Sequence, residues 1–297
     1  MSGRPPGPDG VAVVDKPAGW TSHDVVARSR RLLGTRKVGH AGTLDPGATG
    51  VLLLGAGRAT RLLRFLSGLS KSYVGEVVLG VETTTLDDEG EVTATHDMAG
   101  VGVEDVRAAA AAFVGEIDQV PPMVSAVKVG GRRLHELARA GEVVERAPRR
   151  VTVHALAVDP VPGDDLAFRL SVTCSSGTYV RSLAADLGRA LGGGAHLRRL
   201  RRTAVGPFGL DEAVALDALG PDGLLPPAVA LRGRPAVSVD DPDVVTAVGH
   251  GKVRPDEVLG IEGDGGGPWA VLDAAGTLLA VYERHGAGRV KPAVVLA

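Results

Sequence analysis

The sequence is poor in cysteine, and this scarcity excludes two kinds of site. Cys174 is the single cysteine among 297 residues, so neither an internal disulfide nor a zinc site built from cysteines can form. Nothing in the sequence places beside Cys174 a basic partner that would make its thiol reactive. We therefore interpret Cys174 as a small residue of a strand rather than a nucleophile.

Long apolar runs are also missing. No stretch approaches the roughly 18 apolar residues that a membrane-spanning helix needs. The first ten residues, MSGRPPGPDG, lack the basic and then apolar order of a secretory signal. The sequence therefore predicts a cytoplasmic protein with no membrane partner. Its length and its 44% hydrophobic content allow one large core and a smaller one, so we expect two domains.

A strong net charge is absent as well, because the formal charge is −2. Nucleic-acid-binding domains are usually strongly basic, but segregated charge can still present a positive face. Acidic residues gather at 86–91 and 240–243. Basic residues gather in four runs, RSRRLLGTRK (28–37), GRRLHELAR (131–139), ERAPRR (145–150) and HLRRLRR (196–202). One such run alone favours a solvated helix face, whereas four together indicate a surface that binds a polyanion.

Helical and strand patterns alternate along the chain without an internal repeat. Thr21 or Ser22 caps a predicted helix that ends before Gly34. A second helix begins near 178 and carries one apolar face, formed by Val180, Leu183, Ala184, Leu187 and Leu191. Other helices are expected at 59–68, 103–114 and 132–141, and strands at 10–16, 51–57, 71–80, 125–129, 150–158 and 166–174. Sequence rich in proline and glycine around 220–235 indicates a domain boundary, followed by a small β-rich domain.

The stretch GHAGTLDPGATG (39–50) sets Asp45 in a glycine-rich turn. Such turns often bind phosphate through backbone N–H groups, but the Gly-Lys-Ser/Thr ending of a P-loop is missing, which excludes a nucleoside-triphosphate site of that kind. Asp-Pro-Gly is also ordinary turn chemistry, in which the carboxylate accepts from nearby backbone N–H groups. From local spacing alone, Asp45 is either a turn residue or a functional carboxylate.

Four motifs in order decide between these alternatives. They are VDKPAGWTSHDVV (14–26), RKVGHAGTLDPGATG (36–50), KSYVGEVVLG (71–80) and CSSGTYVRSLAADLG (174–188). The second resembles the active-site motif of the bacterial tRNA pseudouridine-55 synthases, the TruB family, and the others resemble that family's further motifs. Residues 121–151 resemble its RNA-gripping insertion, and GAHLRRLRRTAVGPF (194–208) its closing strand. The resemblance covers roughly residues 10–215.

The resemblance implies an α+β fold, with a mixed, largely antiparallel central sheet and flanking helices. It assigns residues 1–235 to a catalytic domain with an insertion near 120–150, and 236–297 to a small PUA-like RNA-binding domain, where GHGKVRP is the best match. The implied reaction isomerises uridine 55 in the TΨC loop of tRNA and gains or loses no atoms. We therefore expect no cofactor, no metal and no guide RNA, and a monomer whose partner is the tRNA T-arm.

Three residues match the family's catalytic positions. Asp45 matches the catalytic carboxylate, which acts as a nucleophile or assists a proton shift. Arg181 matches the arginine that keeps this carboxylate charged against desolvation; otherwise it is a surface arginine at a helix start. Tyr73 matches the tyrosine that stacks on the uracil; otherwise it is a half-buried strand aromatic.

Further residues match positions that bind substrate or RNA. His40 matches a histidine that props the loop once its base has left the stack, and Leu200 an apolar residue of the uracil pocket. The remaining expected contacts are Lys16, Lys128, Tyr179, Arg199 and Arg202. Ordinary alternatives are a structural histidine, a core leucine, and lysines of turns or of the surface. The sequence departs from the commoner family pattern at His135, where tyrosine is frequent.

Two other functions remain open. One is a synthase of the related archaeal and eukaryotic type that depends on a guide RNA, although no stretch resembles its extra protein-docking extension. The other is a tRNA-folding chaperone without catalysis. The presence of Asp45, Tyr73 and Arg181 favours an enzyme over the chaperone.

Overall fold

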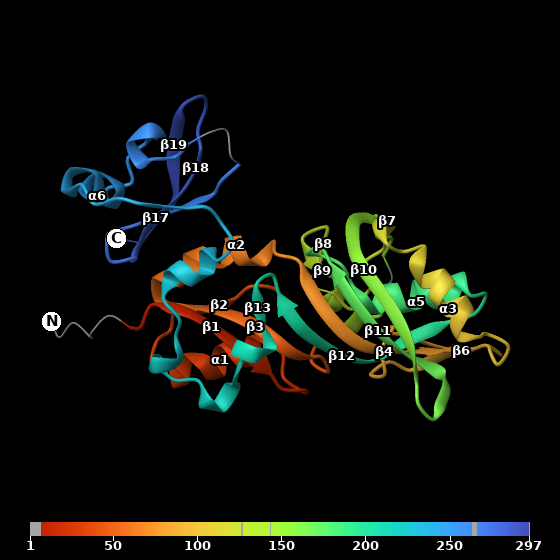
Figure 1. Cartoon of the computed structure of the whole chain (residues 1–297). Coiled ribbons are helices and arrows are strands. Elements are labelled where there is room, and N and C mark those ends of the chain that lie inside the picture. Colours follow the sequence, from red (N-terminus) through yellow and green to blue (C-terminus); the bar gives the residue numbers. More distant parts are fainter. Residues whose placement is uncertain (1–6, 126, 143, 263–265, 297) are drawn as a thin grey trace. The chain divides into compact units, whose positions relative to one another are not determined.

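The computed structural model describes residues 7–125, 127–142, 144–262 and 266–296, with the backbone alone for 128, 129, 133, 135 and 139. The chain forms two compact units (Figure 1). The terminal unit comprises Met1–Asp45, Val51–Gly68 and Pro207–Ala297, and the central unit comprises Pro46–Gly50 and Leu69–Gly206. The chain crosses from the first unit into the second directly after Asp45.

The first part of the terminal unit is a small sheet packed on a helix. Strand β1 (Gly10–Lys16) lies between β14 (Val214–Ala215) and β3 (Thr49–Ala56), and β2 (Val38–His40) pairs antiparallel with β3. Helix α1 (Ser22–Leu32) begins at the N-cap Thr21, which forms a capping box with Asp24. Its buried face contacts the apolar side of this sheet. Helices η1 (Gly57–Leu62) and α2 (Leu63–Ser67) follow β3, so the first turns of the helix predicted at 59–68 are 3-10.

The last part of the terminal unit is a separate five-stranded sheet in the order β15-β17-β18-β19-β16. The strands are β15 (Ala236–Ser238), β16 (Arg254–Pro255), β17 (Trp269–Leu272), β18 (Leu278–Arg284) and β19 (Arg289–Val295), with helix α6 (Pro242–Gly249). Val248, Trp269 and Tyr282 belong to its apolar core. The short elements between the two parts are β13 (Phe208–Gly209), η2 (Leu210–Glu212), η3 (Leu216–Ala218), η4 (Pro221–Gly223) and η5 (Pro227–Leu231), and η6 (Glu257–Leu259) precedes β17. The domain boundary near residue 235 remains a prediction.

The central unit is built on an antiparallel sheet in the order β12-β4-β11-β10-β7. The strands are β4 (Lys71–Leu79), β7 (Gly115–Gln119), β10 (Arg149–Val161), β11 (Asp164–Cys174) and β12 (Ala195–Val205). Burial alternates along β4, as expected when one face of a sheet is covered. Thr49 and Gly50 pair in parallel with Arg201 and Arg202, which makes the sheet mixed. The predicted α+β class with a mixed, largely antiparallel sheet is confirmed.

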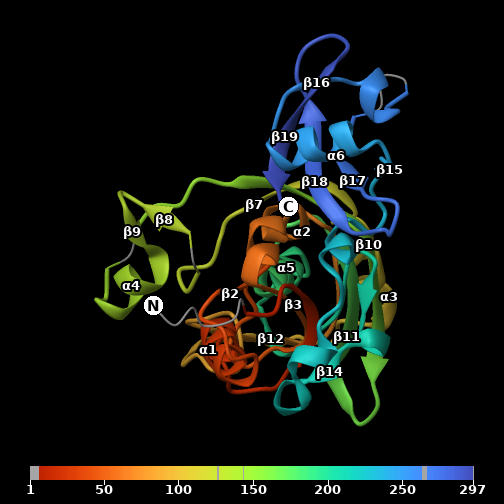
Figure 2. The same cartoon turned by 90° about the vertical axis from the view of Figure 1, so that its left-hand side faces the viewer.

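Helices and hairpins complete the central unit. Helices α3 (Val103–Ala111) and α5 (Val180–Ala190) contact each other and cover the sheet at β10 and β12. Helix α5 buries the predicted stripe up to Leu187, whereas Leu191 is its half-buried C-cap. The hairpin of β5 (Val81–Thr83) and β6 (Val92–Thr95) was not predicted. Strands β8 (Lys128–Val129) and β9 (Arg132–Arg133) and helix α4 (Leu134–Arg139) stand away from the sheet (Figure 2).

In the parts of the chain that the structure describes, no helix has both the length and the apolar character needed to cross a membrane.

Candidate active site

The loop that carries Asp45 is held from one side by a buried hydroxyl of α1. Ser22 Oγ donates to the carbonyl oxygen of Leu44 (3.2 Å) and accepts from the Leu44 N–H (2.9 Å). Asp45, the next residue, is half-buried. The sequence predicted Ser22 only as a helix cap, but Thr21 takes that role. Ser22 instead fixes both backbone groups of the residue before Asp45, so it is a site residue that sequence reasoning missed.

Glycines let the segment after Asp45 approach the central sheet. Gly50 has a φ of +104°, and a Cβ there would lie 2.1 Å from the carbonyl oxygen of Arg202. A Cβ on Gly47 would lie 2.9 Å from Oε1 of Glu89. A side chain at position 50 is therefore excluded by backbone, and one at position 47 would displace the Glu89 side chain. These glycines accommodate β12 and the 86–91 loop of the protein itself.

Arg181 is buried, with 4% of its surface exposed. Its two terminal nitrogens donate to the carbonyl oxygens of Thr85 (2.8 Å) and Val124 (2.9 Å). Oδ2 of Asp87 lies 3.3 Å from Nη1. The alternative of a surface arginine at a helix start is therefore wrong. The guanidinium is fixed in place by two backbone oxygens and one carboxylate of the central unit.

Asp87 is the acidic partner of Arg181 that the sequence did not identify. It lies in the stretch 86–91, which composition presents as an acidic surface patch. Thr85 and Asp87, both in the connection between β5 and β6, contact the same guanidinium. No periodicity marks this pairing, because the two partners are far apart in the sequence. The motif TYVR identified the arginine, and only the fold identified this carboxylate.

Tyr73 lies on β4 and is buried. It stands opposite Val172 on β11 and Arg202 on β12, and Leu200 stands opposite Gly75. Directly opposed residues of antiparallel strands point to the same face, so Tyr73 and Leu200 share one face of the sheet. A Cβ on Gly75 would lie 3.4 Å from Cδ1 of Leu200, so Leu200 extends over this glycine. Leu200 is half-buried, so one part of its side chain is accessible to a ligand.

The predicted basic contacts differ sharply in exposure. The Arg199 side chain is 77% exposed and its Nη1 lies 3.8 Å from Oε1 of Glu76. Arg202 is 0% exposed, so the prediction that it offers its charge to RNA at the surface is wrong for this fold. Lys16 is also fully buried, and its Nζ donates to the carbonyl oxygens of Pro17 (3.0 Å) and Trp20 (2.6 Å). Lys16 therefore closes its own turn, the ordinary alternative.

The remaining predicted residues lie on separate elements. His40 lies on β2, and its ring meets His23 of α1 edge to face, with centroids 5.5 Å apart. Tyr179 is the N-cap residue of α5, and its backbone N–H and C=O both bond the side chain of Gln119 (2.7 and 3.0 Å). Gln119 is buried and was also missed. Lys128 lies on β8, but its side chain lies outside the described part of the structure, as does that of His135.

Cys174 does have a basic neighbour, contrary to the sequence-based interpretation. Lys71 of β4 stands directly opposite it on β11. Burial, reinforced by the charge of Arg202, lowers the pKa of Lys71 to about 8. Burial also raises the pKa of the Cys174 thiol despite this neighbour. A buried thiol held protonated is a poor nucleophile, so Cys174 remains an inert strand residue.

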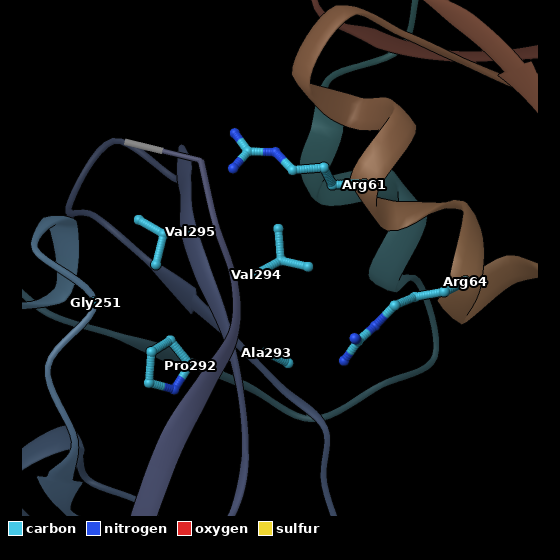
Figure 3. Close-up of a pocket in the computed structure, with 7 residues that line it drawn as sticks. All are labelled: Arg61, Arg64, Gly251, Pro292, Ala293, Val294 and Val295. Carbon is cyan, nitrogen blue, oxygen red and sulfur yellow. The ribbon is translucent and has the colours of Figure 1, made fainter.

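A second basic feature lies within the terminal unit. An open groove of about 540 Å³ is lined by Arg61 and Arg64 on one side and by Gly251 and Pro292–Val295 on the other (Figure 3). Nη2 of Arg64 lies 2.7 Å from Oε1 of Glu283, whereas the Arg61 side chain is exposed and its charge acts on the Asp9 carboxylate. The groove thus combines an apolar strand wall with an exposed guanidinium.

Comparisons with known proteins agree with this arrangement. Residues 30–180 match the TruB family pseudouridylate synthase N-terminal domain, and residues 181–221 match the tRNA pseudouridylate synthase B C-terminal domain. The chain is 48% identical to tRNA pseudouridine synthase B of Mycobacterium sp. (strain KMS), over 100% of this chain and 98% of that protein. It is 46% identical to tRNA pseudouridine synthase B of Arthrobacter sp. (strain FB24), over 97% and 96% of the two chains.

Solved structures show the same fold. A chain of a Cbf5–Nop10–Gar1 complex superposes with a TM-score of 0.69 and 31% identity, covering 94% of this chain and 79% of that chain. A chain of an H/ACA RNP bound to a substrate RNA containing 2′-deoxyuridine superposes with a TM-score of 0.71 and 26% identity, covering 97% and 85%. Motifs, fold and full-length identity all agree, and the chain belongs to the TruB family of pseudouridylate synthases.

Proposed function

We propose that this protein isomerises uridine 55 in the TΨC loop of tRNA to pseudouridine, without a guide RNA. The observation that carries the proposal is the buried Arg181 guanidinium, fixed by Thr85 and Asp87 of one loop. Gly47 and Gly50, which closely follow Asp45, approach that same loop and β12. The relatives' shared name, tRNA pseudouridine synthase B, supports tRNA as the substrate.

The proposed reaction uses a carboxylate and requires no cofactor, because it neither gains nor loses atoms. The N1–C1′ glycosidic bond breaks, the uracil turns, and C5 joins C1′, while the proton on C5 moves to N1. Asp45 either attacks C1′ as a nucleophile, as carboxylates do in retaining glycosidases, or assists a proton shift through an eliminated sugar. Both routes require Asp45 to be ionised when the base is bound.

Arg181 supplies the charge that such a carboxylate needs. A carboxylate that loses water beside a flipped base is pushed toward its neutral form, and a nearby cation opposes this effect. An arginine stays protonated in proteins, and its planar fork is here held by backbone oxygens that cannot take its proton. In this proposal Asp87 orients Arg181, and Arg181 keeps Asp45 ionised.

Tyr73 and Leu200 are proposed to bind the uracil of the target uridine. A uridine must leave the stack before its glycosidic carbon can be reached, and flipped bases are commonly held between aromatic and apolar side chains. Tyr73 and Leu200 share one face of the sheet formed by β4 and β12. We assign Tyr73 to stacking on the uracil and Leu200 to lining its pocket, and Tyr73 is also the candidate base for the proton shift.

RNA binding is assigned to exposed basic groups outside this face. Arg199 is exposed on β12, and the hairpin β8–β9 with α4 stands away from the sheet (Figure 2), as a segment that grips RNA would. Lys128 belongs to that hairpin, Tyr179 precedes Arg181 by two residues, and His40 ends β2, shortly before the loop that carries Asp45. Arg61 adds an accessible cation in the terminal unit.

A guide-dependent synthase is the second candidate, because the H/ACA RNP chain shares this fold. The deciding experiment incubates the purified protein with unmodified tRNA, without added RNA or metal, and maps pseudouridine. The proposal predicts conversion of one uridine, in the T-loop. Conversion that appears only when a guide RNA is added would establish the second candidate. Binding and refolding of tRNA without conversion would establish the chaperone.

A further inference from the structure

His196, at the start of β12, is a buried histidine that the mechanism above does not use. It is 7% exposed. Its Nδ1 lies 3.0 Å from the carbonyl oxygen of Val81, and its Nε2 lies 2.9 Å from Oδ1 of Asp88. Both partners belong to the β5–β6 region that supplies Thr85 and Asp87 to Arg181.

Both neighbours of this ring are hydrogen-bond acceptors. A carbonyl oxygen can only accept, and an ionised carboxylate can only accept. Each neutral tautomer of histidine carries one N–H, so a neutral ring makes one of the two bonds. Only the doubly protonated ring donates to both Val81 and Asp88, and its positive charge then faces the Asp88 carboxylate.

The same part of β12 binds the loop through its backbone. The Leu197 N–H donates to the carbonyl oxygen of Leu86 (3.0 Å), and Asp87 and Leu197 form an isolated parallel bridge. Leu86 has a φ of +63°, a region that a leucine enters only when the surrounding structure holds it there. The loop that contacts Arg181 keeps this unfavourable conformation through hydrogen bonds of its own, such as that from Thr83 Oγ1 to the carbonyl oxygen of Asp87 (2.7 Å), and through its attachment to His196 and Leu197.

We propose that His196 is a positioning residue for the isomerisation. Its two hydrogen bonds, to Val81 and Asp88, hold the Thr85–Asp87 segment against the Arg181 guanidinium. This inference rests on the proposed role of Arg181. The role of Asp88 as the partner of a buried histidine is an addition to that mechanism, since Asp88 itself is half-exposed and contacts neither Arg181 nor, in this proposal, the substrate.

Other charged groups around the histidine have partners of their own. On the neighbouring hairpin, Nε2 of His96 lies 2.9 Å from Oε1 of Glu82, and both side chains are partly exposed. On β12, Arg198 is bound by Glu76 and Asp164. Asp88 is thus the carboxylate that the structure describes in contact with His196. The His96–Glu82 pair, at the β5–β6 hairpin that also carries Asp88, offers a matched control.

Two substitutions at His196 separate its two bonds. The amide nitrogen of glutamine matches the position of Nε2, so His196→Gln can still donate to Asp88. The amide nitrogen of asparagine matches Nδ1, so His196→Asn can donate to Val81 and loses Asp88. Because a misplacement of about 1 Å can cost about 100-fold in rate, we expect His196→Asn and Asp88→Ala each to lower single-turnover conversion of tRNA about 10- to 100-fold. His196→Gln should lose less, and His96→Asn should be normal.

Two further measurements separate positioning from a general structural role. Affinity for tRNA should be unchanged in the His196 and Asp88 variants. The double variant His196→Asn/Asp88→Ala should be no slower than the slower single variant, because the two residues act as a pair.

Hydrogen exchange of the 84–91 segment tests the attachment independently of catalysis. It should be faster in His196→Asn and Asp88→Ala than in wild type and in His96→Asn. Unchanged exchange, or normal turnover in both variants while Arg181→Met is inactive, overturns the inference. Normal turnover in Arg181→Met would instead refute the proposed role of Arg181, and faster exchange in the two variants would still identify His196 as the residue that holds this loop.

Discussion

Two acidic stretches that look alike in the sequence behave differently in the fold. In LDDEGE (86–91), Asp87 contacts the buried Arg181 and Asp88 contacts the buried His196. In DDPD (240–243), Asp241 is the N-cap of α6 and accepts from the backbone N–H groups of Asp243 and Val244. The first stretch contacts buried basic side chains of the central unit, and the second begins a helix at the surface. Composition determines the charge of an acidic segment, but its structural role depends on the groups that it contacts in the fold.

The strongest test of this comparison concerns a third acid, Asp45, which stands alone in its loop. Asp45→Asn keeps the turn and removes the charge and the nucleophile. If Asp45 is the catalyst, single-turnover conversion should fall on the order of 10⁴-fold or more. Affinity, which comes mainly from phosphate contacts and stacking, should be retained, as should the thermal melt. A variant that still isomerises uridine within about tenfold of wild type would leave Asp45 a turn residue.

Removing the cation that the first acidic stretch orients should have the next largest effect. Arg181→Met removes the cationic partner of Asp87 and the donor to the Thr85 carbonyl oxygen, and turnover should fall far more than affinity. Arg181→Lys restores the charge but not the planar fork, so it should rescue turnover only in part. Both are measured by single-turnover kinetics beside filter binding. Full activity of the lysine variant would mean that charge alone suffices.

Asp87→Asn tests whether the first stretch acts through its charge. The amide still fits beside Arg181 but no longer offers a carboxylate. We expect turnover to fall about 10- to 100-fold, because small losses of alignment are amplified in the chemical step. Asp241→Asn is the matched control, since asparagine is an equally good N-cap. Equal turnover in Asp87→Asn and Asp241→Asn would show that the two acidic stretches do not differ in their effect on catalysis.

Charge reversal at exposed arginines should affect binding and leave chemistry intact. Arg199→Glu combined with Arg61→Glu should weaken tRNA affinity and flatten its fall between about 50 and 200 mM salt, because each lost phosphate contact reduces the salt slope by about one. Arg202 is unsuitable for this test, since it is buried. Arg234→Glu, an exposed position outside the basic runs, is the control. An unchanged dependence of affinity on salt would show that Arg199 and Arg61 are solvated arginines that do not contact the tRNA.

The smallest effect is expected at the second acidic stretch. Asp241→Ala removes the side chain that accepts from Asp243 N (2.8 Å) at the start of α6. The free energy of unfolding should fall by about 1 kcal/mol, the usual cost of losing such a cap. Turnover of tRNA at 25 °C should be normal. A large loss of turnover with an unchanged melt would show that this stretch has a functional role as well.

Much of the secondary structure could be predicted, because it depends on local patterns. The apolar face from Val180 to Leu191 predicted α5, and the strands predicted at 150–158 and 166–174 correspond to β10 and β11. The β5–β6 hairpin was missed because its strands are short, polar and separated by the acidic loop. Of the strand predicted at 125–129, in which residue 126 lies outside the described residues, the structure describes β8, which pairs with β9 in one short hairpin.

The candidate site was predictable only in part. Motifs identified Asp45, Tyr73 and Arg181 as residue types at specific places in the sequence. They did not identify Ser22, which fixes the backbone next to Asp45, or Gln119, which fixes Tyr179. Ser22 lies within the first motif, where the sequence presents it as a helix cap, and Gln119 lies outside all four motifs.

The sequence by itself determined the residues that carry the chemistry and the local elements that hold them, because motif spacing and apolar periodicity act over a few residues. The tertiary structure decided which charges are buried and which charges meet. Lys16 and Arg202 look like surface cations in the sequence and are fully buried, whereas Arg199, near Arg202 on the same strand, is exposed. Asp87 and Arg181 are far apart in the chain and 3.3 Å apart in space. Burial and long-range pairing depend on how strands pair across the sheet, and that information is not local to any segment.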